Sequence, residues 1–175
     1  MTLAIALTLA LATTACDGDG HHDESPDGHE SADGEGGQRH EDTPFDPERD
    51  CTLEFESDTY VAGIEKVGAQ GTLKLRILDA DPAPPDKGEN RLTVQLIAAD
   101  DGGEIDGATL GLDPTMPEHG GHGSTAAAIT PLGSEGKYEV VALNLSMAGL
   151  WRLLFTIETA DGRTDVIEFL FCVRG

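Results

Sequence analysis

The segment "DPTMPEHGGHGS", residues 113–124, places one methionine and two histidines at three-residue intervals. These are Met116, His119 and His122, in a chain of 175 residues with only three methionines and six histidines. Thioether sulfur and imidazole nitrogen are the ligands that copper(I) prefers, and several must converge on one ion. The glycines around the histidines allow the backbone to wrap tightly. The alternative is an exposed turn in which the polar residues face water and the methionine packs at the edge of the core.

The residues that flank this segment predict strands. Residues 72–78 alternate Leu73, Leu75 and Ile77 with Lys and Arg, and residues 90–100 continue the alternation. A period of two is typical of half-buried strands. Further runs of this kind are residues 60–68, 105–112, 126–132, 136–145, 151–160 and 165–173. Seven or eight strands without a helix-length segment predict an all-β, immunoglobulin-like β-sandwich, in which the proline-rich residues 79–90 form a loop.

The predicted strands also predict which loops share an end of the sandwich. In simple antiparallel connections, alternate loops lie at the same end. Counting in this way puts the segment 113–124 and the turn 146–149, which contains Met147, at one end, together with Cys51 and Cys172. We therefore expect Met147 to complete a copper site. A zinc site would instead use the two histidines with Glu118 or Asp113, but the H-E-x-x-H helix motif of zinc proteases is absent.

The first residues, "MTLAIALTLALATTAC", are apolar and end in small residues followed by Cys16. This run is too short to span a membrane and resembles the apolar region of a secretion signal. Its end resembles a bacterial lipobox, in which the cysteine becomes the lipidated first residue of the mature protein. Residues 1–16 therefore predict a lipoprotein anchored at the bacterial cell envelope, facing the periplasm or the outer surface. The alternative is an ordinary signal peptide.

Lipidation of Cys16 would leave Cys51 and Cys172 as an even pair. In an oxidising compartment such a pair most simply forms a disulfide. The alternative is a pair of thiolate ligands for a soft metal.

Residues 17–50 differ sharply from the rest of the chain. Thirteen of these residues are acidic, and one large apolar side chain, that of Phe45, is present. Such a composition predicts a disordered tether, and the folded domain then covers residues 51–175. The tether histidines, His21, His22, His29 and His40, either capture metal ions loosely or belong to a solvated spacer.

The charge balance excludes some partners. A formal net charge of −22, with 11 Lys and Arg residues, argues against nucleic-acid binding and against electrostatic docking on an anionic membrane. A metal ion or a cationic partner fits better. The chain lacks G-x-S-x-G, Walker A and dinucleotide-binding motifs, so we do not expect an enzyme, and a small hydrolase is the least favoured class.

Three segments together resemble a known family: "TLKLRILDADPAPPDKGENRLTVQL", "TMPEHGGHGS" and "GKYEVVALNLSMAGLWRLLFTIETADG". They are similar to the YtkA-like family, which includes FixH-like domains. The resemblance implies an immunoglobulin-like β domain, exported or membrane-attached and linked with copper handling or respiratory-oxidase assembly. By position it implies that the Met/His loop comprises Met116, His119 and His122, and that the second methionine turn is Met147–Gly149.

We therefore predict a cell-envelope lipoprotein whose β-sandwich binds copper through Met116, His119, His122 and Met147. Its partners would be the metal ion and a membrane protein of the respiratory or copper-transport machinery. The alternative function is a metal-free β-sandwich adaptor that contacts a membrane protein.

Overall fold

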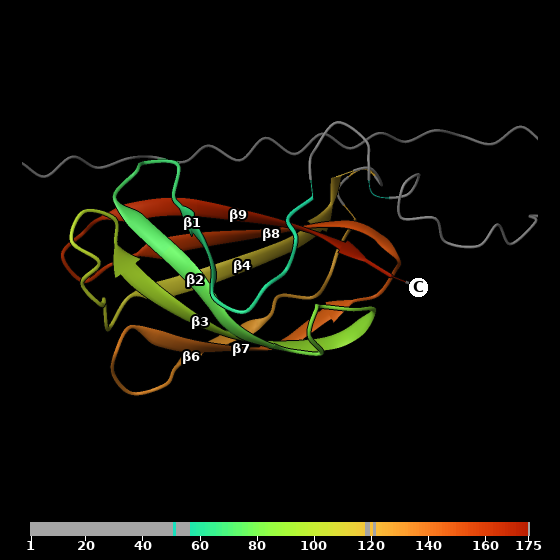
Figure 1. Cartoon of the computed structure of the whole chain (residues 1–175), viewed down its shortest axis with the longest axis horizontal. Helices are drawn as coiled ribbons and strands as arrows, with labels where there is room; N and C mark the ends of the chain where they lie inside the picture. Colours follow the sequence, from blue (N-terminus) through green and yellow to red (C-terminus); the bar gives the residue numbers. More distant parts are fainter. Residues whose placement is uncertain (1–50, 52–56, 118–119, 121, 175) are drawn as a thin grey trace, which may run out of the picture. The chain divides into compact units, whose positions relative to one another are not determined.

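The segments with alternating apolar and polar residues form paired β-strands in the computed structural model. The structure describes residues 51, 57–117, 120 and 122–174. The strands within these residues are β1 (Ile64–Val67), β2 (Leu73–Asp81), β3 (Gly88–Ala98), β4 (Thr109–Met116), β5 (His122–Gly123), β6 (Ala128–Pro131), β7 (Lys137–Leu145), β8 (Gly149–Glu158) and β9 (Thr164–Val173). They form a five-stranded sheet in the order β1-β2-β3-β7-β6 and a four-stranded sheet in the order β5-β4-β8-β9. The two sheets face each other as layers (Figure 1). This confirms the predicted all-β sandwich.

The hydrophobic core fills the space between the two layers. The alternating residues Leu73, Leu75 and Ile77 of β2 are completely buried, as are Leu92 and Leu96 of β3. The four-stranded sheet contributes large side chains from β8 and β9, among them Trp151, Phe155 and Phe169. Edge-to-face packing of Phe155 and Phe169, with ring centroids 6.2 Å apart, adds to the gain from burying these rings. The period-two pattern therefore identified the core faces of these strands correctly.

Several strand limits differ from the predicted ones. β2 extends to Asp81 and β3 begins at Gly88, so the connection comprises only residues 82–87 rather than the predicted 79–90. The backbone of residues 88–90 pairs with β7, which makes these residues strand. β1 begins at Ile64 rather than at residue 60, because a turn with Gly63 at a positive φ of 86° precedes it. Hydrogen bonding to neighbouring strands, which is not local in sequence, sets these limits.

The segment 113–124 is only partly a loop. β4 continues through Met116, and residues 122–123 form the short strand β5, which raises the number of described strands to nine. The cause is the long pairing of β4 with β8, in which Thr109 through Thr115 lie opposite Glu158 through Arg152. The expectation that Met116 belongs to a loop is therefore wrong, because this residue ends a strand.

A buried carboxylate holds the turn between β1 and β2 against β9. Asp165 is 3% exposed and accepts hydrogen bonds from the backbone amides of Gln70, Thr72 and Leu73, from the Thr72 hydroxyl, and from its own neighbour Val166. A Cβ atom at Gly68 would lie 2.1 Å from the Asp165 carboxyl carbon, so this turn requires glycine. Burial tends to raise the pKa of Asp165, but the backbone amide donors outweigh it and lower the pKa below its usual value.

The segment that precedes β1 is fixed to β9 in two ways. Cys51 and Cys172 form a disulfide with a Cα–Cα distance of 5.6 Å, which confirms the predicted pairing. Asp58 donates its amide to the carbonyl of Leu170 and accepts the Leu170 amide on its carboxylate. The same carboxylate lies 2.6 Å from the ammonium group of Lys66. Together these contacts cover part of the otherwise open edge of β9.

Substitution of a glycine in the turn between β6 and β7 should strongly lower the stability of the domain. Gly136 has a positive φ of 62°, and a Cβ atom there would lie 2.4 Å from the Leu96 carbonyl oxygen. The Leu96 carbonyl oxygen belongs to the backbone of β3, so it cannot move away without disturbing that strand. We expect Gly136→Ala to lower the free energy of unfolding by roughly 2–4 kcal/mol, as the midpoint of urea unfolding would measure.

Gly133 in the same turn provides the matched control. It also has a positive φ, 87°, but a Cβ atom there would meet nothing within 4 Å. Gly133→Ala should therefore cost only the backbone strain, about 1–2 kcal/mol. Equal losses in the two variants would contradict the proposed steric cause.

Some predictions fall outside the described residues. These are the signal segment 1–16 with its lipidated Cys16, the tether 17–50 with its histidines, and His119. Within the part of the chain that the structure describes, no helix is long and apolar enough to cross a membrane.

Candidate metal centre

The strand register brings the predicted ligand-bearing segments to one end of the sandwich. β4 and β8 run antiparallel with Thr115 opposite Arg152, so β4 ends where β8 begins. β9 ends at the same level, because Leu150 lies opposite Cys172. The turn that contains Met147 immediately precedes β8. Met116, Met147 and the Cys51–Cys172 disulfide are therefore at the same end, as strand counting predicted.

Met116 contributes to the core. It is 1% exposed and belongs to the same buried cluster as Trp151. Its backbone pairs with that of His122 across β4 and β5. Two of the four predicted ligand residues are thus direct cross-strand neighbours. Because Met116 faces the core, any ion that it contacts would be shielded from water.

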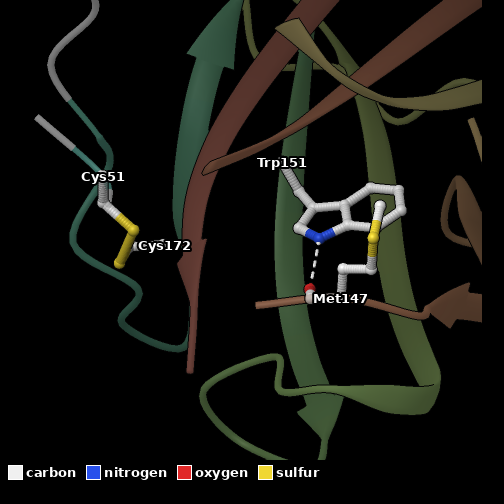
Figure 2. Close-up of a disulfide and its surroundings, with 4 residues drawn as sticks. All are labelled: Cys51, Met147, Trp151 and Cys172. Atoms are coloured by element: carbon white, nitrogen blue, oxygen red, sulfur yellow. Dashed lines mark hydrogen bonds between the residues drawn. A yellow bond between two sulfur atoms is a disulfide. The ribbon is translucent and has the colours of Figure 1, made fainter. Parts of the chain in front are cut away.

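Met147 has the opposite environment. It is 42% exposed, in the turn between β7 and β8. Its carbonyl oxygen accepts a hydrogen bond of 2.9 Å from the indole nitrogen of Trp151. Figure 2 shows this bond and shows the Met147 side chain pointing toward the six-membered ring of the indole. Its thioether is available to a ligand from solvent.

Trp151 links the two methionines. Its side chain is 1% exposed and lies in the core with Met116, while its N–H group reaches the backbone of Met147. The sequence-based prediction did not identify Trp151 as the residue that holds the preceding turn in place. The sequence feature that could have indicated this hydrogen bond is the four-residue spacing from Met147 to Trp151, with Gly149 between them. Gly149 has a φ of 132°, a backbone conformation that favours glycine.

The acidic, cysteine and histidine side chains give less support to a metal site than the methionines do. Among residues 51, 57–117, 120 and 122–174, no group of three or more His, Cys, Asp or Glu side chains is arranged to hold a metal ion. Asp113, a member of the alternative zinc set, is exposed on β4, whereas Glu118 lies outside the described residues. Cys51 and Cys172 are joined to each other, which rules out their alternative role as free thiolate ligands. Of the four predicted copper ligands, Met116 and Met147 have described side chains, and both are thioethers.

A cavity of about 400 Å³, which no local sequence pattern predicts, lies beside the disulfide. Its walls include the disulfide, Tyr60, Phe171 and the pair Pro84–Pro85. The Tyr60 hydroxyl oxygen is buried without a hydrogen-bond partner among the described residues, and burial raises its pKa. The walls come from segments far apart in sequence, so only the tertiary fold creates this cavity.

The fold and the methionine-bearing end define a class: an all-β sandwich of two antiparallel sheets with soft side chains at one end. Residues 70–155 match the model of the YtkA-like family, so this part of the chain is a YtkA-like domain. The match includes β2 through most of β8, and with them Met116 and Met147.

Solved structures with a similar fold include two of FetP from uropathogenic Escherichia coli. The first is a copper-bound variant with 14% sequence identity and a TM-score of 0.44, covering 65% of this chain and 96% of FetP. The second is the protein as isolated after expression in the periplasm, with 14% identity, a TM-score of 0.44, and coverage of 66% and 96%. No curated protein sequence matches this chain.

Proposed function

We propose that this protein is a non-enzymatic cell-envelope lipoprotein whose β-sandwich binds copper(I) at the end that bears Met116 and Met147. The observation that carries the proposal is the convergence of three backbone segments at this end. β4 brings Met116, β5 places His122 opposite it, and the turn before β8 brings Met147. His119 lies in the connection between β4 and β5 and completes the proposed ligand set.

The two methionines have different roles in this proposal. Met147 is exposed and meets the incoming ion, whereas Met116 is buried and provides a second sulfur from the apolar side. An apolar shell excludes water and controls the properties of a bound metal. Neutral thioether and imidazole ligands in such a shell suit a soft, singly charged ion. Zinc gains little from thioether sulfur, so copper(I) should bind more tightly.

The disulfide supports the proposed location. Structural disulfides persist in oxidising compartments such as the bacterial periplasm and are rare in the cytosol. The Cys51–Cys172 disulfide joins the start of the domain to its last strand, and so it fits a domain that folds after export. Lipidation at Cys16 and a membrane-protein partner in copper transport or oxidase assembly are parts of the same proposal.

Copper titration of the purified protein tests this function. The tether histidines, His21, His22, His29 and His40, should first be replaced by Asn, since they would compete for metal. We expect one copper(I) site with a weaker affinity for zinc. His119→Ala or His122→Ala should weaken copper(I) binding at least about tenfold, because each removes one of four ligands. Met147→Leu should weaken it as well.

The control keeps the ligands and changes a charge nearby. Asp113→Asn alters an exposed residue of β4 without removing a soft ligand, and copper(I) affinity should stay the same. Equal copper(I) uptake by the tether-substituted protein and its His119→Ala/His122→Ala derivative would contradict the proposal. A metal-free adaptor would then be the better interpretation.

A further inference from the structure

The two methionines of the described domain differ greatly in the exposed fraction of their side chains. Met147 is 42% exposed in a turn, and Met116 is 1% exposed at the end of β4. Thioether oxidation requires contact between sulfur and a dissolved oxidant, so exposure largely sets its rate. The domain therefore contains one accessible thioether and one protected thioether at the same end.

The surroundings of Met147 hold it in place. The Trp151 indole donates to its carbonyl at 2.9 Å, and the following Gly149 begins β8. The side chain points toward the indole ring in Figure 2, an arrangement that suits sulfur and an aromatic ring. Trp151 is the single tryptophan of the chain, and its indole N–H is hydrogen-bonded to the Met147 carbonyl, so a change at Met147 affects a residue in direct contact with this fluorophore.

We propose that Met147 is a reversible oxidation site for peroxides that reach the surface of the domain. The Met147 sulfur attacks one oxygen of the peroxide, and the O–O bond breaks. That oxygen gives up its proton and forms the S=O bond of methionine sulfoxide, and the other oxygen takes up a proton and leaves as water for hydrogen peroxide or as an alcohol for an organic peroxide. Sulfur loses two electrons and the peroxide gains them. Reduction by a methionine sulfoxide reductase restores the thioether.

The modification would regulate the proposed metal site, and this step rests on the proposed function. Sulfoxide presents a hard oxygen and a sulfur whose free electron pair is a poorer donor, so it loses the preference of thioether for copper(I). The polar S=O group also disfavours contact with the indole ring. Oxidation of Met147 should therefore have the same effect on copper(I) affinity as Met147→Leu.

Mass spectrometry of peptides from the full chain tests the site itself. The folded, metal-free protein is treated with dilute hydrogen peroxide, and the gain of one oxygen is followed over time. We expect Met147 to oxidise at least about tenfold faster than Met116, because Met116 reacts only when the β4 end opens. In denaturant the two rates should become similar. Equal rates in the folded protein would overturn the proposal.

Two variants separate local from general effects. Oxidation should change Trp151 fluorescence in the parent and in Met116→Leu, but not in Met147→Leu. A sulfoxide reductase should restore the original fluorescence and remove the added oxygen. A fluorescence change that persists in Met147→Leu would show that the oxidant acts elsewhere, and the proposed link between Met147 and Trp151 would be wrong.

A copper(I) titration of the oxidised protein then separates the two proposals. Loss of affinity that equals the Met147→Leu effect supports regulation at this site. Unchanged affinity in the oxidised protein overturns the regulation but leaves the proposed copper function intact. If neither form binds copper(I), the proposed function fails, whereas selective oxidation of Met147 is still decided by the peptide kinetics.

Discussion

Asp165→Asn should lower the free energy of unfolding by about 3 kcal/mol or more, since a net charged hydrogen bond contributes roughly 1.5–3 kcal/mol and several are lost together. Asp165 accepts backbone hydrogen bonds from Gln70, Thr72 and Leu73, which hold the β1–β2 turn against β9. Asparagine has the same shape, but its amide group would face backbone donors. Urea unfolding followed by Trp151 fluorescence would measure the loss.

The effect of Asp165 should also depend on pH. Its pKa is lowered in the folded protein, so its contribution is fully present above the unfolded value, about 3.9, and is lost as the pH falls through the lower folded value. The parent should therefore lose stability in this acid range more steeply than Asp165→Asn does. Some acid sensitivity should persist in the variant, because hydrogen bonds from Thr159 and Arg163 lower the pKa of Asp161 to about 2.

Asp100→Asn is the control for this experiment. Asp100 is exposed, and among the described residues its carboxylate accepts a hydrogen bond only from the adjacent amide of Asp101. This variant should unfold within about 0.5 kcal/mol of the parent, as is usual for surface substitutions. A similar small loss for Asp165→Asn would contradict the anchoring role that we assign to the buried carboxylate.

Replacement of both Cys51 and Cys172 by alanine should lower the free energy of unfolding by about 2–5 kcal/mol. The disulfide joins residues 121 positions apart, and closing so long a loop removes much entropy from the unfolded chain. Unfolding by guanidinium chloride with and without a reductant would measure the effect. The reductant should destabilise the parent and leave the double variant unchanged. Equal stability of the oxidised parent and the double variant would contradict this prediction.

The fold was largely predictable because its strands carry a strong local pattern. The alternation of Leu73, Leu75 and Ile77 with Lys74 and Arg76 gave the inner face of β2 correctly. The strand ends were less predictable. β4 extends to Met116 because it pairs with β8, and that partner is far along the chain. Likewise, the local sequence contains no sign that Asp165 would receive the amides of the β1–β2 turn.

The location of the candidate site was predictable from the sequence, but the burial of its individual methionines was not. Counting strand directions placed Met116, Met147, Cys51 and Cys172 at one end correctly, even though the chain crosses between sheets after β3, after β5 and after β7. Spacing could not reveal that Met116 is buried while Met147 is exposed, because burial depends on which face of β4 meets the core. The copper ligand set itself stays a prediction.

The two attachments of the N-terminal segment to β9 have a mechanical consequence. A pull on the chain from its N-terminal side reaches Cys51 first and passes through the disulfide to Cys172, two residues before the end of the described chain. β9 then resists the load along its full length, because it pairs with β8 at every position from Thr164 to Val173. Any tension between an anchored N-terminus and a partner would therefore be carried by the β8–β9 pair. Among the described strands, the short β4–β5 pair, which holds Met116 opposite His122, is joined to β9 only through β8.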